Sequence, residues 1–510
     1  HEGKIKLLDY FKKEISSRSY ADWVFDEKMK FLRSHMNGEL NNLMRWLDPL
    51  IGKEGSRPAT EIKEAMAVLM SAFPVYRIYP DRLPLSETDR SRLKEAFEKA
   101  FMKASGLKEV LEGLQRFFQK EPAGDEYLYF LRRWAQYTAP LAAKGTEDTV
   151  FYNYDPLISH NEVGDSPDHT PVTAGRFHEL MARRLQDAGL SLNASSTHDS
   201  KRGEDNRLRI NLISRYADEW IAWVEKWKRI NGPFRRMHHE QPAPSAHDEY
   251  LIYQALVGAV PENGRISLAF RKRFEKYLIK ALKEEKQETG WEYPDTDYEK
   301  YCLEFLNHIL SPAHDFLSGF LPFASRIVEQ ADIFSLGQTL IKLTAPGIPD
   351  IYQGAECRDL SLVDPDNRLP VDYAGRISMM NAILSKEEEG DIPILDYVKQ
   401  HAGSGAQKMF LIRKILHTRK KFPDLFNRGR YLPLVSTSNL IGYVRENEDR
   451  QLLVLVPLPS ASEETVPLQD SHIHGRWTCL FSNQEREIDD LTGSGALLEK
   501  FPVAALIRQK

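Results

Sequence analysis

Residues 190–207 place a short apolar run directly before a charged segment, Leu190-Ser191-Leu192-Asn193-Ala194-Ser195-Ser196-Thr197-His198-Asp199-Ser200-Lys201-Arg202-Gly203-Glu204-Asp205-Asn206-Arg207. The apolar run, formed by the first five residues, predicts a buried strand. Residues 198–207 then hold three acids, three bases and a histidine. At the C-terminal end of a strand in a β/α barrel, such side chains project toward a shared pocket, where carboxylates can accept hydrogen bonds from sugar hydroxyls. A charged helix start with Asp199 as its N-cap explains the same residues, so both interpretations stay open.

Two other stretches carry candidate binding groups. Residues 143–152, Ala143-Lys144-Gly145-Thr146-Glu147-Asp148-Thr149-Val150-Phe151-Tyr152, combine a lysine, two carboxylates and aromatic faces with a glycine, and glycine permits close backbone approach. That combination suits a carbohydrate, and a loop that caps a helix is an equal interpretation. The third stretch is Pro349-Asp350-Ile351-Tyr352-Gln353-Gly354-Ala355-Glu356, followed by Asp364-Pro365-Asp366-Asn367-Arg368. Its Asx and Pro residues are also typical of a plain surface turn.

The amino-acid composition narrows the classes of partner that the protein can have. The 510 residues are 42% hydrophobic and 10% aromatic, and 69 basic against 74 acidic residues give a formal net charge of −5. Because this balance shows no bias toward polyanions, we predict no nucleic-acid partner. No apolar run approaches the roughly 20 residues that span a bilayer, so we predict no membrane partner. Cys302, Cys357 and Cys479 match neither a disulfide framework nor a metal motif, which favours a cytoplasmic protein.

The periodicity of apolar residues divides the chain. Helical spacing dominates from Lys4 to Phe118 and again over 203–335. The acidic stretch 386–391 is interpreted as a linker, and short β-branched runs over 422–510 predict a small all-β domain. The chain begins without a Met or a signal-peptide pattern, so we expect it to begin partway through a larger architecture.

Together these stretches resemble the maltooligosyl trehalose synthase family of the α-amylase superfamily, glycoside hydrolase family 13. The string Ser196-Thr197-His198-Asp199-Ser200-Lys201-Arg202-Gly203-Glu204-Asp205 is specific to this branch, whereas His-Asp alone marks only the superfamily. The other matching segments are Phe73-Pro74-Val75-Tyr76-Arg77, 144–149, 345–354, 360–368 and 501–507. The resemblance spans nearly the whole chain.

The resemblance implies roles for two residues. Asp199 would be the third catalytic carboxylate, at the end of the seventh barrel strand, where it grips two hydroxyls of the reacting sugar. His198 would hydrogen-bond the same sugar. The nucleophile and acid/base of a retaining glycosidase stand about 5–5.5 Å apart, and in this family they follow the fourth and fifth strands. The sequence has no Gly-x-Arg-x-Asp segment for the nucleophile and no matching acid/base glutamate. We therefore expect the chain alone to be inactive, with the missing N-terminal part of the enzyme as a partner.

The predicted fold class is α/β plus all-β. It is a partial TIM (β/α)8 barrel, made of the late β/α units, with large helical insertions and a C-terminal antiparallel β-sandwich domain. The expected segments are a helical insertion at 1–135, barrel β/α units with the catalytic Asp at 136–202, a helical subdomain at 203–335, the last barrel β/α unit at 336–400, and a C-terminal helix with the β-domain at 405–510.

The implied reaction is an intramolecular transglycosylation by an isomerase of trehalose biosynthesis. It converts the reducing-end α-1,4 link of a maltooligosaccharide to an α,α-1,1 trehalose link through a covalent glycosyl-enzyme. Candidates for gripping the reducing-end glucose are Lys144, Glu147, Asp148, Lys201, Arg202 and Glu204, and Asp205, Tyr352, Gln353, Asp366 and Arg368 are further substrate-binding candidates. Two alternatives remain: another α-glucan-active amylase or glucanotransferase, and a non-catalytic glucan-binding protein derived from such an enzyme.

No cofactor is implied, and two histidine clusters are interpreted without a metal. His238-His239 and His472-Ile473-His474 each lack the three or four converging ligands that a metal site needs. The tryptophans between Trp220 and Trp227 stand near helical spacing. We therefore expect them to pack in a core, with a lining role in a glucan cleft as the other possibility.

Overall fold

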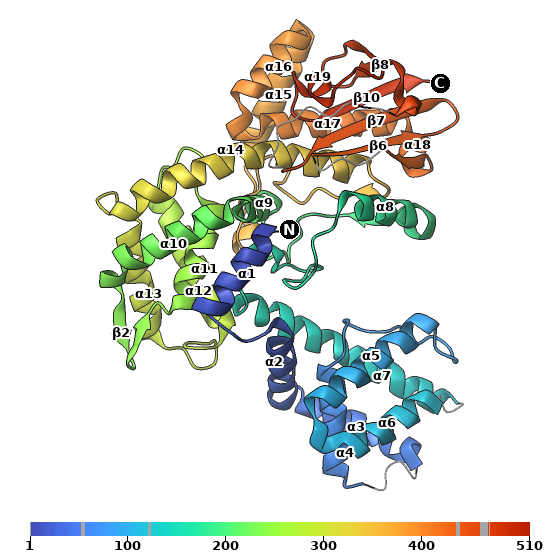
Figure 1. Ribbon diagram of the computed structural model, residues 1–510, viewed down its shortest axis with the longest axis vertical. Coiled ribbons are helices and arrows are strands. Elements are labelled where there is room, and N and C mark those ends of the chain that lie inside the picture. The colour runs from blue at the N-terminus through green and yellow to red at the C-terminus, as the bar shows by residue number, and fades with distance from the viewer. Residues whose placement is uncertain (1, 53–56, 121–123, 435–438, 460–467, 469) are drawn as a thin grey trace. The chain divides into compact units, whose positions relative to one another are not determined.

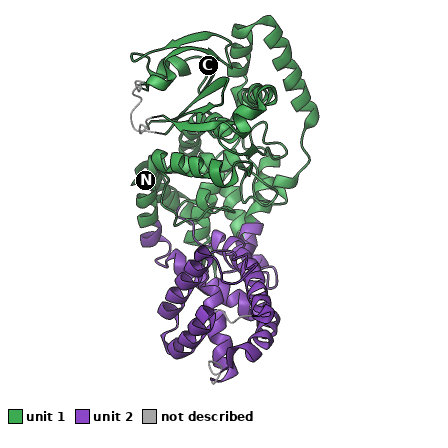
Figure 2. Ribbon diagram, turned by 90° about the vertical axis from the view of Figure 1, so that its right-hand side faces the viewer, with its two compact units in different colours: residues 1–10, 157–278, 301–510 green, residues 11–156, 279–300 purple. Residues whose placement is uncertain are grey.

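The chain forms two compact units in a computed structural model that describes residues 2–52, 57–120, 124–434, 439–459, 468 and 470–510. Unit 1 comprises residues 1–10, 157–278 and 301–510, and unit 2 comprises residues 11–156 and 279–300 (Figure 2). Each unit has its own apolar core. The five segments expected from the sequence stay a prediction about the architecture.

Unit 2 is built from helices, as the apolar spacing predicts (Figure 1). They are α2 (Tyr20–Ser34), α3 (Asn37–Ile51), α4 (Ala59–Ser71), α5 (Glu87–Lys103), α6 (Lys108–Lys120) and α7 (Asp125–Ala142), and α1 (Glu2–Glu14) leads into the unit from unit 1. Ser19 and Ser86 cap α2 and α5 by accepting backbone N–H groups at 3.1 Å, which satisfies donors that a helix start leaves open. The core that results is aromatic, and Phe118 packs edge-on against Trp134 with ring centroids 5.8 Å apart.

The first half of unit 1 is also helical, in agreement with the prediction for 203–335. Its helices are α8 (Ala174–Ala188), α9 (Glu204–Leu212), α10 (Ala217–Asn231), α11 (Ala246–Ala259), α12 (Leu268–Glu285), α13 (Thr296–Ile309) and α14 (Asp315–Thr344). A short hairpin, β2 (Arg236–His238) with β3 (Gln241–Ala243), lies between α10 and α11. Trp220 and Trp227 are fully buried and meet edge-on at 5.6 Å, so the expectation that they pack in the core is confirmed.

One pair of parallel strands includes part of residues 190–207. β1 (Leu192–Asn193) pairs with β4 (Ile348–Pro349), with Leu192 opposite Ile348. The strand expected before residue 195 is therefore present and has a parallel neighbour. It is not buried as predicted, because Leu192 is 67% exposed and Leu190, just before the strand, is 63% exposed. Among the described residues these two-residue strands form the only parallel pair. A partial barrel is not established by that pair and stays a proposal.

The C-terminal part of unit 1 combines helices with an antiparallel sheet. The helices are α15 (Tyr373–Glu389), α16 (Asp391–Gln400), α17 (Ala406–Lys421) and α18 (Pro423–Asn427). The strands are β5 (Arg430–Pro433), β6 (Leu440–Glu446), β7 (Arg450–Pro457), β8 (Gly475–Cys479), β9 (Glu485–Ile488) and β10 (Ala504–Gln509), in the order β5-β6-β7-β10-β8-β9. α19 (Ser494–Leu498) precedes β10. The antiparallel β-domain expected at the end of the chain is confirmed.

Two details of that prediction need correction. Among the described residues from 430 to the end of the chain, the strands belong to one six-stranded sheet instead of the two stacked sheets of a β-sandwich. One face of the sheet packs on helices, where Val454 lies in a core with Phe410 of α17, so helices take the place of the second sheet. The acidic stretch 386–391 is not a linker, because Lys386 and Glu389 close the end of α15 with an ion pair at 2.7 Å and α16 begins at Asp391.

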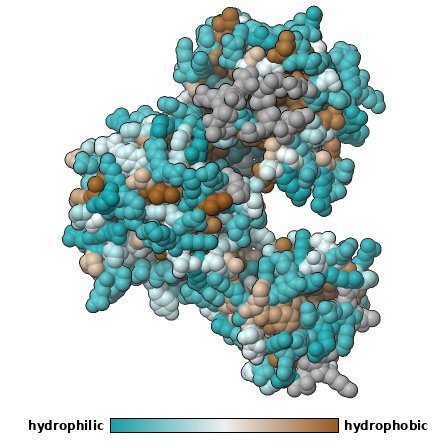
Figure 3. Space-filling model, viewed as in Figure 1, coloured by the Kyte–Doolittle hydropathy of each residue, from teal (hydrophilic) through white to brown (hydrophobic). Residues whose placement is uncertain are grey.

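The face of the molecule drawn in Figure 3 is mainly polar. On the face drawn in Figure 3, hydrophobic residues occur in small groups among hydrophilic ones. Over the residues that the structure describes, no helix combines the length and the apolar character needed to cross a membrane.

Candidate functional site

His198 and Asp199 lie in a tight turn directly after β1, and both side chains are exposed. The turn is closed by its own hydroxyl groups. The Asp199 N–H donates to Thr197 Oγ1 at 3.2 Å, and the Thr197 N–H donates to Ser200 Oγ at 2.9 Å. The local structure thus holds the backbone of the turn and leaves the imidazole and the carboxylate at the surface, where they can contact a ligand.

Asn367 holds this turn from the other side. Its amide Nδ2 donates to the carbonyls of Thr197, His198 and Ser200, at 3.4, 3.2 and 3.2 Å. Arg368 Nε adds a hydrogen bond to the His198 carbonyl at 3.2 Å. Asn367 was quoted in the sequence motif without being chosen as a site residue, and no signal in the sequence pairs it with a turn 170 residues away.

The remaining candidates of the third stretch lie around Asn367. The Tyr352 hydroxyl donates to the Asn367 carbonyl at 3.0 Å. Asp366 accepts the Leu362 N–H at 2.8 Å and pairs with Arg273 at 3.0 Å. Gln353 and Arg368 are exposed. Tyr352 and Asp366 are therefore committed to the support of the loop, whereas Gln353 and Arg368 present their side chains to solvent.

Glu162 anchors the segment that follows the turn. Its carboxylate accepts the N–H groups of Lys201 at 2.8 Å and Arg202 at 3.1 Å, and Arg207 Nη1 donates to it at 3.0 Å. The Arg202 guanidinium is buried and donates to the Tyr277 hydroxyl at 3.1 Å. Sequence reasoning missed Glu162, because a single acid in a loop carries no pattern.

Glu204 and Asp205 form a buried ion network with two lysines. Lys408 Nζ lies 2.6 Å from Glu204 and 2.8 Å from Asp205, and Lys342 Nζ lies 2.9 Å from Glu204. Burial alone would raise the pKa of Glu204, but the charges of Lys408 and Lys342 lower it to about 2. The same carboxylates raise the pKa of Lys408 despite its burial. The network joins α9 to α14 and α17, so its first effect is to fix the start of α9.

These contacts change the interpretation of four candidates. Lys201, Arg202, Glu204 and Asp205 were expected to touch the sugar directly, yet their exposed fractions are 6%, 2%, 0% and 4%. Arg202, Glu204 and Asp205 already have internal partners for their charges. These side chains are therefore engaged inside the protein, and direct contact with a sugar stays a prediction for them. A charged run is usually solvated, and the lysines that make burial possible come from helices that begin more than a hundred residues later.

The second candidate group belongs to unit 2. Lys144 and Glu147 lie in a π-helical turn, Ala143–Glu147, that continues α7. Lys144 Nζ pairs with Asp148 Oδ2 at 2.6 Å, and both side chains are partly exposed, at 56% and 30%. Glu147 is buried and accepts a hydrogen bond from the Tyr76 hydroxyl. Lys144 and Asp148 are thus accessible to a ligand, whereas Glu147 is committed to Tyr76.

Gly145 makes a close helix approach possible at this turn. A Cβ at this position would lie 2.9 Å from Lys28 Cγ and 3.0 Å from Lys28 Cα, closer than side-chain atoms pack. Lys28 in turn donates to the Phe73 carbonyl at 3.0 Å, and its burial lowers the pKa of its ammonium to about 8. Two motifs of the resemblance, 73–77 and 144–149, are therefore brought together around Lys28 and the bond from Tyr76 to Glu147.

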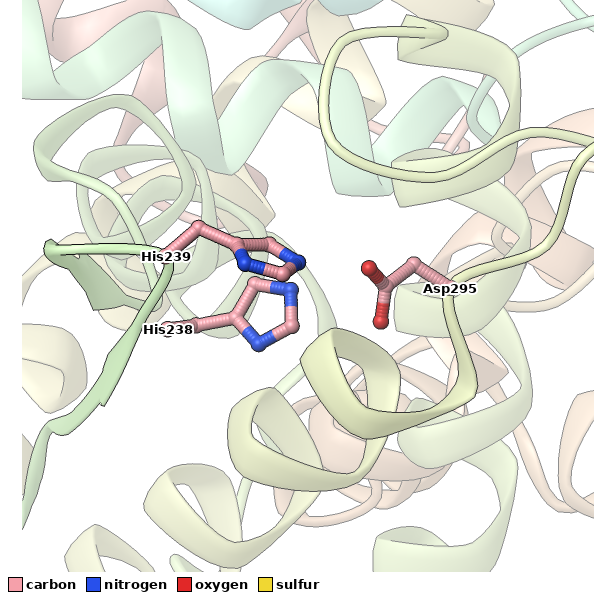
Figure 4. A group of neighbouring side chains, drawn as sticks. All are labelled: His238, His239 and Asp295. Carbon is pink, nitrogen blue, oxygen red and sulfur yellow. The ribbon is translucent and has the colours of Figure 1, made fainter.

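One of the two histidine clusters considered for a metal, His238-His239, lies on the hairpin of unit 1. His238 and His239 have ring centroids 4.1 Å apart (Figure 4). Asp295, drawn with them, is a residue of unit 2. The two imidazoles of unit 1 provide two ligands, whereas a protein metal site uses three or four. We assign no metal to them.

Comparison with known proteins gives a consistent answer. No family model matches the chain. Two curated proteins from Mycobacterium tuberculosis, of strains CDC 1551 and H37Rv, are each 31% identical over 393 residues, which is 74% of this chain and 45% of theirs. The solved structure of the Arthrobacter ramosus enzyme superposes with a TM-score of 0.80 at 25% identity, covering all of this chain and 61% of that one. A Sulfolobus tokodaii structure at 24% identity, with a TM-score of 0.72, shows the same fold.

These findings make the chain a relative of trehalose-forming synthases. The two curated proteins and the two structures carry the name maltooligosyl trehalose synthase, so the resemblance recognised in the motifs is confirmed. The chain spans about half the length of the curated relatives that it matches.

Proposed function

We propose that the chain provides the third catalytic carboxylate and part of the glucan-binding surface of a maltooligosyl trehalose synthase, a (1→4)-α-D-glucan 1-α-D-glucosylmutase. The observation that carries the proposal is the exposed pair His198 and Asp199, in a turn after a strand that has a parallel neighbour. In a barrel, that end of a strand faces the site. We further propose that β1 and β4 are the seventh and eighth strands of a TIM-type barrel of family 13.

In the proposed reaction Asp199 makes and breaks no covalent bond. Its carboxylate accepts hydrogen bonds from two hydroxyls of the reacting glucose and favours the oxocarbenium-like ring, and His198 donates to the same sugar. Such groups act by stabilising charge that develops in the transition state. Their position depends on the turn that Asn367 holds, which is why we assign Asn367 to positioning.

The covalent steps need two more carboxylates. The nucleophile attacks C1 of the penultimate glucose while the acid/base protonates the departing O4, which gives a glycosyl-enzyme and a free glucose. That glucose turns, its anomeric hydroxyl loses a proton to the acid/base, and its oxygen displaces the nucleophile. The 510 residues have no Gly-x-Arg-x-Asp segment, so a segment outside this sequence would supply both groups. A bound maltooligosaccharide and that segment are the proposed partners.

The other candidates divide by exposure. We propose Lys144, Asp148, Gln353 and Arg368, whose side chains reach solvent, as groups that bind glucose units. We propose Lys201, Arg202, Glu204 and Asp205 as positioning residues, because they are buried behind the turn. Glu147, Tyr352 and Asp366 would support the loops that carry the exposed groups. A cytoplasmic location, favoured by three cysteines that match no disulfide framework, stays a prediction.

The test removes one negative charge at Asp199. The chain is combined with the portion of a relative that carries the nucleophile and acid/base, and maltohexaose is assayed for loss of reducing ends and for the trehalose linkage by NMR. We expect Asp199→Asn to lower kcat by about 10²–10³-fold without a change in melting temperature. The matched control is Asp187→Asn, an exposed acid on α8 that pairs with Arg183 at 3.1 Å. Equal activity of both variants would contradict the proposal.

A further inference from the structure

Trp291 is the most exposed of the eight tryptophans of the chain. Its exposed fraction is 56%, whereas Trp134, Trp220 and Trp227 are fully buried. Trp46 is the other exposed indole, at 41%, but its ring packs against Tyr129 with centroids 4.6 Å apart. Exposing a large aromatic side chain leaves apolar surface in water, and exposed apolar surface of this kind is typical of a binding site.

The loop that carries Trp291 is firmly built within unit 2. It joins the end of α12 to the start of α13. The buried Thr289 hydroxyl donates to Glu299 at 2.7 Å and accepts the Asp295 N–H at 2.9 Å. The Tyr298 N–H then bonds Asp295 at 3.0 Å. Both sides of the exposed indole are therefore anchored, and its exposure is a property of an ordered loop.

Charged groups fix the ring itself. Lys283 Nζ lies 5.1 Å from the centroid of the indole ring, and the ring N–H is hydrogen-bonded to the Glu284 carboxylate. A cation over a π face and a bonded N–H hold a tryptophan at low entropic cost. Burial, followed by repulsion from Asp148, raises the pKa of Glu284, so Glu284 and Asp148 lie near one another.

The loop is joined to the turn 143–149 that was singled out from the sequence. Lys286 Nζ donates to Thr149 Oγ1 at 2.8 Å, and that hydroxyl donates to the Lys144 carbonyl at 3.0 Å. The exposed Lys144–Asp148 pair and the exposed indole thus belong to one connected surface of unit 2. A pyranose has an apolar ring face and a polar edge of hydroxyl groups. An exposed indole beside charged groups that bind hydroxyls therefore offers a pyranose a complementary surface.

We propose that Trp291, held by Glu284 and Lys283, is a stacking platform for a glucose unit of an α-1,4-linked glucan. The inference deepens the proposed function and rests on it for the identity of the sugar. The Lys144–Asp148 pair binds hydroxyls of the same glucan. Covering a half-exposed indole removes roughly 80 Å² of apolar surface from water, which corresponds to about ten- to thirtyfold in Kd.

The experiment measures binding in the 510-residue chain and needs no catalysis. Maltoheptaose is titrated while tryptophan fluorescence is recorded, with binding confirmed by saturation-transfer NMR. We expect saturable binding by the wild type, a Kd at least tenfold weaker for Trp291→Ala, and an intermediate loss for Trp291→Phe, which keeps an aromatic face. Trp46→Ala is the matched control, an exposed tryptophan of the same unit, and its Kd should equal that of the wild type.

Other outcomes overturn the platform. Equal binding by Trp291→Ala and Trp46→Ala, read by NMR, would show that the glucan lies elsewhere. If the wild type does not bind maltoheptaose, the proposal is wrong. A protein partner, such as another segment of the enzyme, would then be the alternative ligand of the indole. If Asp199→Asn keeps full activity while glucan binding still depends on Trp291, the proposed reaction is wrong and the stacking platform is supported. The two proposals can therefore be contradicted separately.

Discussion

The segment 201–205 of unit 1 and the turn 143–149 of unit 2 have similar composition and opposite surroundings. Both contain a lysine and two carboxylates beside a glycine. In the first, Glu204 and Asp205 are buried with Lys342 and Lys408. In the second, Lys144 and Asp148 form a pair at the surface. The comparison shows that a similar composition can form a buried ion network or stay at the surface. We propose that the buried segment fixes a backbone and that the exposed turn binds a ligand.

The largest effect should follow from removing Lys408. The substitution Lys408→Met leaves Glu204 and Asp205 buried with one ammonium fewer, and breaking a buried ion network costs about 3–5 kcal/mol. The free energy of unfolding from urea titration measures the loss. Lys420→Met is the control, since Lys420 is exposed on the same helix and should change stability by no more than about 0.5 kcal/mol. Equal stability of the two variants would show that the network contributes little.

Acid should weaken the same network. The pKa of Glu204 falls from 4.5 to about 2 on folding, so the folded state favours the ionised form. Its contribution of roughly 3 kcal/mol is complete above pH 5 and is lost as the pH falls through the folded pKa near 2. Urea titrations between pH 6 and pH 2 measure this slope. In Glu204→Gln the slope should be smaller over that range, and a slope identical to that of the wild type would contradict the assignment.

Asn367 should have an intermediate and local effect. Asn367→Asp keeps the shape but places carboxylate oxygens against three carbonyls, and a lost buried donor costs about 1–3 kcal/mol. We expect faster amide exchange at residues 197–200, measured by mass spectrometry, with little change in α3 or α4 of unit 2. Arg368→Ala, which removes one hydrogen bond from an exposed side chain, should increase exchange less. Uniform exchange changes over the chain would indicate general destabilisation instead of a held turn.

The helices and strands can be predicted well from the sequence, whereas the long-range contacts of their side chains cannot. Apolar spacing identified the helices of both units, and β-branched runs identified the terminal sheet, because both patterns are local. The place of His198 and Asp199 after a strand could be predicted from the apolar run before them. The burial of Arg202 and Glu204 could not, since it depends on Tyr277, Lys342 and Lys408, which no local pattern connects to them.

The single sheet shows the same limit. A chain of alternating short strands predicts antiparallel pairing, but it does not say what covers each face of the sheet. Here α14 and α17 share a core with Leu452 and Val454 on one face, and Leu453 and Leu455 pack with Trp477 on the other. Strands with both faces buried look alike in sequence whether a helix or a second sheet covers them.

The smallest effect belongs to the exposed pair of unit 2. Lys144→Ala removes an ion pair whose lysine is 56% exposed, and such pairs contribute about 0.2–1 kcal/mol because water screens them. Melting temperature should therefore stay within a few degrees of the wild type. If the pair meets a ligand, the Kd for maltoheptaose should rise severalfold in the fluorescence titration even though stability is kept. Lys99→Ala, a change at a 46% exposed lysine that pairs with Glu95 at 2.7 Å on α5 of the same unit, serves as the control for loss of positive charge. A stability loss as large as that of Lys408→Met, with unchanged glucan binding, would reverse the distinction between the two regions, because the surface pair would then be structural.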